Sequence, residues 1–205
     1  MSLYRRYVFP YVLDHVMHHA SLHDPRAQAL RHARGEVLEI GFGTGANLPH
    51  YPDAIQNLNV VEPEPVLPRR VEQRVRVRGM QIRNHALKGE ALPFADATFD
   101  TVVSTLTLCS VDDPQQVLAE VFRVLRADGQ FLFFEHGLAP DAGIERWQHR
   151  LNGVQQVLGG GCNLNRPMRA LIAQAGFTFS ELEQKYLPGL PKFGAYVSLG
   201  RAVKG

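Results

Sequence analysis

Three glycines at alternate positions follow a short apolar stretch that reads as a strand, residues 36–40. Gly41, Gly43 and Gly45 allow a tight turn and let backbone N–H groups approach a ligand closely. Where such a turn opens a helix, the helix dipole favours a carboxylate or a phosphate. The segment therefore predicts a turn that binds an anionic part of a small ligand.

An acidic residue ends the next apolar stretch, residues 58–62. Glu62 lies roughly 20 positions after Gly41, the separation at which a carboxylate can accept hydrogen bonds from the hydroxyls of an adenosine ribose. The pattern Gly41-x-Gly43-x-x-Ala46 also satisfies the dinucleotide fingerprint. These residues thus predict an adenosine-containing cofactor and leave a nicotinamide dinucleotide open.

Acid–base chemistry has one main candidate, His136, which follows a predicted strand over residues 130–135. Open α/β sheets bind their ligands at the carboxyl ends of the strands, so an imidazole there can serve as a general base. Glu135 could orient it or could simply be a charge that faces a helix. Cys109 and Cys162 fall near the same edge, where a buried cysteine is either a reactive thiol or simple packing.

Apolar runs alternate with segments of helical period, which is typical of an α/β sheet. We predict strands over residues 36–40, 58–62, 80–85, 101–105, 130–135, 177–186 and 195–203, and helices over 114–125, 147–158 and 167–175. Asp128 and Gly129 are expected to separate helix from strand. The apolar stripe Trp147, Leu151, Val154 and Leu158 is expected to pack on the sheet or to roof the acceptor pocket, and the glycine run 159–161 to act as a hinge.

Composition excludes several classes of protein. The chain has 205 residues and a formal charge of +2, with no long basic block, so nothing requires a nucleic-acid partner. Two cysteines far apart form no disulfide framework, which favours a reducing, cytoplasmic compartment. The apolar run at residues 7–13 is too short for a membrane span of about 20 residues, so we expect no integral span.

Four histidines near the N-terminus invite a metal interpretation, because His15 and His19, or His19 and His23, stand one helical turn apart. No cysteine or carboxylate completes a ligand set, and the zinc-protease pattern H-E-x-x-H is not met. We therefore predict no metal site. The apolar residues of this segment, Leu13 and Met17 among them, predict an amphipathic helical lid.

Several motifs together resemble the class I S-adenosylmethionine-dependent methyltransferases. They are Glu39 before the glycine turn, the segment 89–94, and Phe99-Asp100 opening a strand that ends at 104–106. The resemblance implies one α/β domain with a seven-stranded, mostly parallel Rossmann-like sheet of order 3-2-1-4-5-7-6, strand 7 antiparallel and helices on both faces. It divides the chain into an N-terminal helical lid (1–35), a cofactor-binding core (36–138) and acceptor-side helices with terminal strands (139–205).

The resemblance also implies S-adenosyl-L-methionine as cofactor and S-adenosyl-L-homocysteine as product. The residues it assigns to the cofactor are Glu39, Gly41, Phe42, Gly43, Gly45, Asn47, Glu62, Pro63, Glu90, Ala91, Thr105 and Cys109. Glu62 would bind the ribose, and the turn at Glu90 would flank the adenine. Lys88 stands where many members carry an aspartate for the adenine amino group, so adenine contacts are expected to come mainly from the backbone.

The chain resembles the thiol S-methyltransferase branch of this family in the segments 108–111, 135–136 and 161–162. This implies a small, apolar acceptor, a thiol first and a lipid or quinone-like head group second. A nicotinamide-dependent oxidoreductase would leave Glu90 and Phe99-Asp100 unexplained, and a non-catalytic cofactor-binding protein stays open. We expect no counterpart of the long apolar N-terminal anchor of the animal enzymes; peripheral membrane contact and the oligomeric state stay open.

Overall fold

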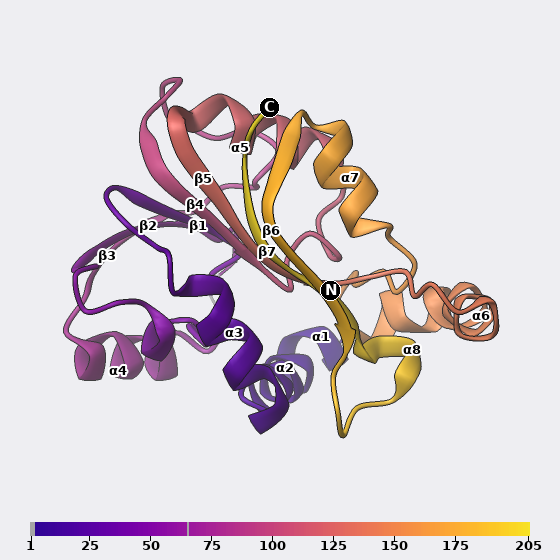
Figure 1. The fold of residues 1–205 in the computed structure, drawn as a ribbon. Helices are drawn as coiled ribbons and strands as arrows, with labels where there is room; N and C mark the ends of the chain where they lie inside the picture. The colour runs from indigo at the N-terminus through magenta and orange to yellow at the C-terminus, as the bar shows by residue number, and fades with distance from the viewer. Residues whose placement is uncertain (1–2, 65) are drawn as a thin grey trace.

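Strands and helices alternate along most of the chain in the computed structural model, which describes residues 3–64 and 66–205 (Figure 1). The first two residues of the predicted lid lie outside these ranges. Within them, seven strands form one sheet of order β3-β2-β1-β4-β5-β7-β6. The strands are β1 (Val37–Ile40), β2 (Asn57–Val61), β3 (Gln81–His85), β4 (Phe99–Thr105), β5 (Leu125–His136), β6 (Phe177–Tyr186) and β7 (Tyr196–Lys204). The pairs from β3 through β5 are parallel and β7 is antiparallel to both neighbours, so the predicted topology is confirmed.

Helices cover both faces of the sheet because successive strand side chains point to opposite sides. In β5, Phe131 and Phe133 join a core with α5 (Pro114–Val124) and α7 (Met168–Gln174). Leu132 joins a second core that includes Leu30 of α3 (His23–Leu30), and partly buried valines of α4 (Pro68–Arg78) pack against it. Burial on both faces explains why Phe131, Leu132 and Phe133 form a continuous apolar run in β5.

The predicted break between helix and strand at Asp128 and Gly129 is wrong. β5 begins at Leu125, directly after α5, and runs through both residues. The register pairs Leu125 with Phe99 and Gln130 with Thr101, so an irregularity in the ladder accommodates the residues between them. A bulge of this kind absorbs extra residues without ending the strand.

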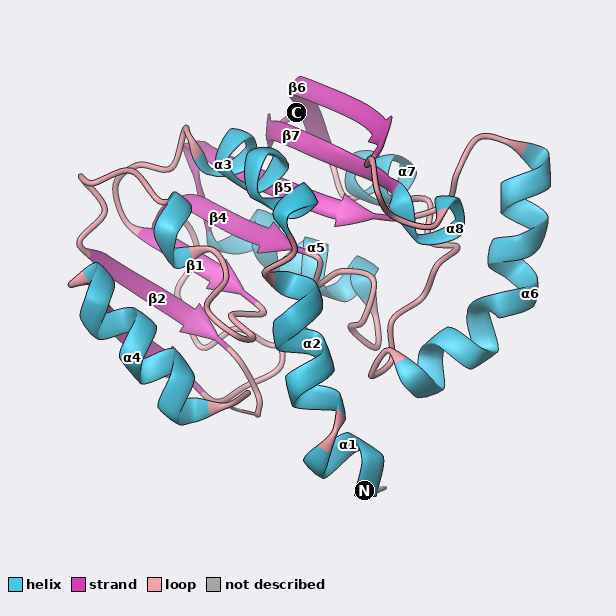
Figure 2. Ribbon diagram, turned by 90° about the horizontal axis from the view of Figure 1, so that it is seen from below, coloured by secondary structure: helices cyan, strands magenta, loops and turns pink. Residues whose placement is uncertain are grey.

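The prediction that the stripe of α6 (Ala142–Leu158) packs on the sheet is also wrong. Trp147, Val154 and Leu158 are each more than half exposed, and Figure 2 shows α6 at the side of the molecule, away from the strands. The buried residue of this helix is Gln148, which accepts from the Ala139 N–H and donates to two backbone carbonyls. A polar anchor therefore holds α6 in place.

The N-terminal lid begins with α1 (Leu3–Tyr7) and α2 (Phe9–Met17), which lead through the short helix η1 (Ala20–Leu22) into α3. The buried carboxylate of Asp14 accepts hydrogen bonds from Arg70 and Arg74 of α4, each at 2.7 Å. The Tyr4 hydroxyl donates to the carbonyl of Leu158 at 2.8 Å. These contacts hold the lid between α4 and the end of α6.

The two remaining helices are η2 (Leu48–His50), after the glycine turn, and α8 (Lys192–Ala195), before β7. In the described ranges, no helix has both the length and the apolar character needed to cross a membrane.

Candidate active site

A cavity of about 440 Å³ opens at the carboxyl ends of β1, β2 and β4. This is the edge where open α/β sheets bind their ligands. The sequence-predicted residues that line it are Glu39, Gly41, Phe42, Gly43, Asn47, Glu62, Pro63, Glu90 and Thr105. The fold thus brings most of the predicted cofactor residues to one cavity, although they are spread from position 39 to position 105.

The turn after β1 depends on glycine for conformation and space. Gly41 has a φ of +76°, and a Cβ built there would lie 2.2 Å from Oγ1 of Thr107 in the loop after β4. The Gly43 N–H donates to the Glu62 carboxylate at 2.8 Å. Burial raises the pKa of Glu62 above its usual value, although the Gly43 bond opposes the shift. The turn and the acid therefore form one unit.

A buried polar network lies beneath the turn. The Glu39 carboxylate accepts from the Tyr51 hydroxyl at 2.6 Å and from the Asn47 amide at 2.9 Å. Asn47 accepts in turn from the Arg26 guanidinium at 2.8 Å and bonds the Thr105 hydroxyl. Burial raises the pKa of Glu39 to about 7, opposed by these hydrogen bonds and by the Arg26 charge, and burial lowers the pKa of Arg26 to about 10.

Sequence reasoning missed Arg26 and Tyr51. Arg26 is 1% exposed, although its helix has no pronounced apolar face. No local pattern indicates a buried arginine, because its partners Asn47 and the Met17 carbonyl lie in other segments.

An ion pair and a hydrogen bond connect the residues at the rim of the cavity near the predicted adenine turn. Lys88 forms an ion pair with Asp112 at 2.6 Å, and this contact raises the pKa of Lys88. The Glu90 carboxylate accepts from the Asp112 N–H at 3.1 Å. Ala91, predicted to contact the cofactor, lies outside the cavity lining, and its N–H donates to the Lys88 carbonyl.

Much of the apolar lining of the cavity comes from the lid. Phe9, Leu13 and Met17 of α2 line the cavity together with Leu106 and Val111. Gly160, after α6, has a φ of +67°, and a Cβ there would lie 2.4 Å from the Phe9 ring. The lid helix therefore rests directly on this glycine, and its helical spacing of four residues aims one apolar stripe at the cavity.

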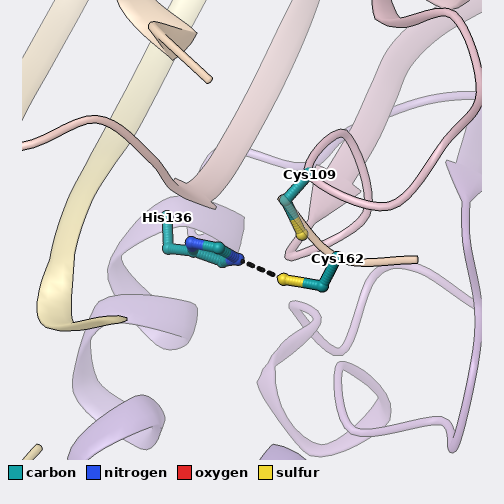
Figure 3. Close-up of side chains that lie close together, drawn as sticks. All are labelled: Cys109, His136 and Cys162. Atoms are coloured by element: carbon teal, nitrogen blue, oxygen red, sulfur yellow. Dashed lines mark hydrogen bonds between the residues drawn. The ribbon is translucent and has the colours of Figure 1, made fainter. Parts of the chain in front are cut away.

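His136, Cys109 and Gly45 do not line the cavity. His136 Nε2 lies 2.9 Å from the Cys162 sulfur, and Cys109 is beside them (Figure 3). The nearby Cys109 thiol and burial raise the pKa of Cys162, which favours the neutral thiol.

The expectation that Glu135 orients His136 is wrong. Its Oε1 accepts from the Ser104 hydroxyl and from the backbone N–H groups of Thr107 and Leu108. Glu135 therefore fixes the loop after β4, part of which lines the cavity. The side chains beside the His136 imidazole are the two cysteines.

The profile described as a methyltransferase domain matches residues 38–133. The rat thiol S-methyltransferase TMT1B is 35% identical over 177 residues, which cover 82% of this chain and 70% of the relative. The chain is a class I S-adenosylmethionine-dependent methyltransferase. A phosphatidylethanolamine N-methyltransferase of Cereibacter sphaeroides is 32% identical over 117 residues, which cover 55% of this chain and 57% of the length of that relative. A methyltransferase of Thermotoga maritima shares the fold, with a TM-score of 0.66 and 24% identity over 98% of both chains.

The residues of this methyltransferase fit S-adenosylmethionine, which supplies a methyl group on a sulfonium sulfur. The glycine turn has room for a ligand, since a Cβ at Gly43 would meet nothing within 4 Å. The Glu62 carboxylate, anchored to that turn, has the chemistry to accept from ribose hydroxyls. We propose that the glycine turn would hold the methionine part of the cofactor, Glu62 the ribose and the turn at Glu90 the adenine side.

Proposed function

We propose that this methyltransferase transfers the methyl group to the sulfur of a small, apolar thiol. The observation that carries the proposal is the apolar wall of Phe9, Leu13 and Met17 over the carboxyl edge of the sheet. An apolar wall gains free energy when it covers an apolar acceptor, by about 25 cal/mol per Å² removed from water. The thiol S-methyltransferase named among the relatives supports sulfur as the acceptor atom.

Positioning and exclusion of water can supply much of the rate of such a transfer. The lid covers the site, and the Asp14 contacts to α4 hold it there. A thiol beside a cationic sulfonium ionises more readily, because an opposite charge favours the thiolate. We therefore propose a reaction without an obligatory side-chain base, since the imidazole of His136 faces Cys162 and not the cavity.

A lipid head group is the second candidate acceptor. Large apolar side chains are exposed on α1, with Leu3 at 77% and Tyr7 at 59%, on α2, with Tyr11 at 53%, and on α6, where Val157 is at 66%. Apolar patches of this kind on a soluble surface mark interaction sites, including membrane contacts. The phospholipid methyltransferase among the relatives favours the same alternative.

A cytoplasmic location is part of the proposal, because both cysteines are free thiols.

A transfer assay with labelled S-adenosylmethionine separates these acceptors. We expect methylation of short alkyl and aryl thiols, with rates that rise with the apolar size of the thiol. Matched alcohols and amines are the controls. Vesicles of phosphatidylethanolamine and a reduced short-chain quinone form two further arms. Turnover only in the vesicle arm would replace the thiol proposal by the lipid one, and cofactor binding without turnover in any arm would refute both.

A further inference from the structure

Three soft donor atoms converge behind the wall of the active-site cavity. The sulfur of Cys109, the sulfur of Cys162 and a ring nitrogen of His136 all lie within 4.8 Å of one another. Cys109 lies in the loop after β4, His136 ends β5 and Cys162 lies in the loop after α6 (Figure 3). Neighbouring donors of a tetrahedral zinc site are about 3.5 to 3.8 Å apart, given zinc–sulfur and zinc–nitrogen bonds of about 2.3 and 2.0 Å. The cluster thus needs only side-chain adjustment to surround an ion.

We propose that Cys109, His136 and Cys162 form a zinc-binding site. Binding removes one proton from each thiol, and both protons go to solvent. Zn²⁺ with two thiolates and a neutral imidazole has no net charge. Neutrality matters here because Cys109 is 2% exposed and Cys162 is 8% exposed, and an uncompensated charge in such surroundings is costly.

His136 Nε2 already points at the Cys162 sulfur, 2.9 Å away, so an ion between the loops can meet both donors without a turn of the ring. A zinc ion bound at Nε2 leaves the ring proton on Nδ1. Three protein ligands leave a fourth position for water.

A zinc ion here would brace the active-site wall. Two residues of the cavity lining are close in sequence to the cysteines. Ser110 follows Cys109, and Gly160 stands two residues before Cys162. Asn163 already joins these loops, since its backbone N–H and side-chain amide both donate to the Cys109 carbonyl. The proposed ion would add β5 to this connection and so fix the loops that support the acceptor side.

Zinc binding can be measured on the full-length protein, reduced and stripped with a chelator. Competition against a chromophoric chelator should show one Zn²⁺ per chain. Cys109→Ser and Cys162→Ser should each weaken binding by more than about 10-fold. His149→Ala, whose imidazole is about half exposed on α6, should leave it unchanged. Co²⁺ in place of zinc should give a sulfur-to-cobalt charge-transfer band that either cysteine variant diminishes.

Two results would overturn the proposal. One is the absence of stoichiometric zinc in the reduced wild-type protein, including the case in which the two cysteines are recovered only as a disulfide. The other is full zinc affinity in folded Cys109→Ser and Cys162→Ser, which would place the ion elsewhere, such as on the histidines of the lid. Circular dichroism of every variant separates loss of ligand from loss of fold.

Discussion

Replacement of Glu62 by glutamine tests the assignment of the ribose site. One carboxylate oxygen of Glu62 accepts the Gly43 N–H at 2.8 Å, and a glutamine carbonyl can keep this bond. The other oxygen becomes an amide NH₂, which donates where a ribose hydroxyl needs an acceptor. A hydrogen bond to a charged group contributes about 1.5–3 kcal/mol, so the Kd for S-adenosylhomocysteine should rise roughly 10- to 150-fold.

Calorimetric titration with S-adenosylhomocysteine measures this change directly. Glu62→Ala should bind still more weakly than Glu62→Gln, because it also removes the acceptor of the Gly43 N–H. Glu145→Gln, on α6 and away from the cavity, is the matched control. An unchanged Kd in a folded Glu62→Gln protein would refute the ribose assignment, and NADH binding in place of S-adenosylhomocysteine would contradict the cofactor itself.

Three further perturbations test the network, the lid and the acceptor wall. Burial raises the pKa of Glu39 from about 4.5 to about 7. The contribution of Glu39 to the free energy of folding is therefore complete below pH 4.5 and is lost as the pH rises through 7. Chemical denaturation should show a loss of about 3 kcal/mol over this range in the wild type and none in Glu39→Gln. Burial opposes the shift, but hydrogen bonds from Arg74 and Arg70 hold the pKa of Asp14 below its usual value. The contribution of Asp14 to the free energy of folding is therefore present above pH 4 and lost in acid. Asp14→Asn should speed proteolysis of the lid at pH 7, and equal cleavage rates would show that the Asp14 contacts with Arg70 and Arg74 do not hold the lid. Gly160→Ala should push Phe9 aside and raise the acceptor KM several-fold with the S-adenosylhomocysteine Kd unchanged; a weakened Kd instead would mean that this wall belongs to the cofactor side.

Local sequence determined the strands, the glycine turn and the acid that faces it. Periodicity and turn residues are set by neighbours in the chain, so they can be recognised without the fold. Gly41 and Glu62 were predicted because both stand at strand ends, and parallel strands bring those ends to one edge. The strand order came from the resemblance to the methyltransferase family, and the sheet confirms it.

Tertiary structure alone decided which side chains meet. Arg26 is buried because Asn47 accepts its hydrogen bond, and α6 leaves Trp147 exposed because Gln148 anchors the helix to a distant backbone. Cys109, Cys162 and His136 were expected near one edge of the sheet, but only the fold shows that their donor atoms lie within 4.8 Å of one another. Each outcome depends on contacts between segments brought together by folding, and such contacts leave no periodic signal along the chain.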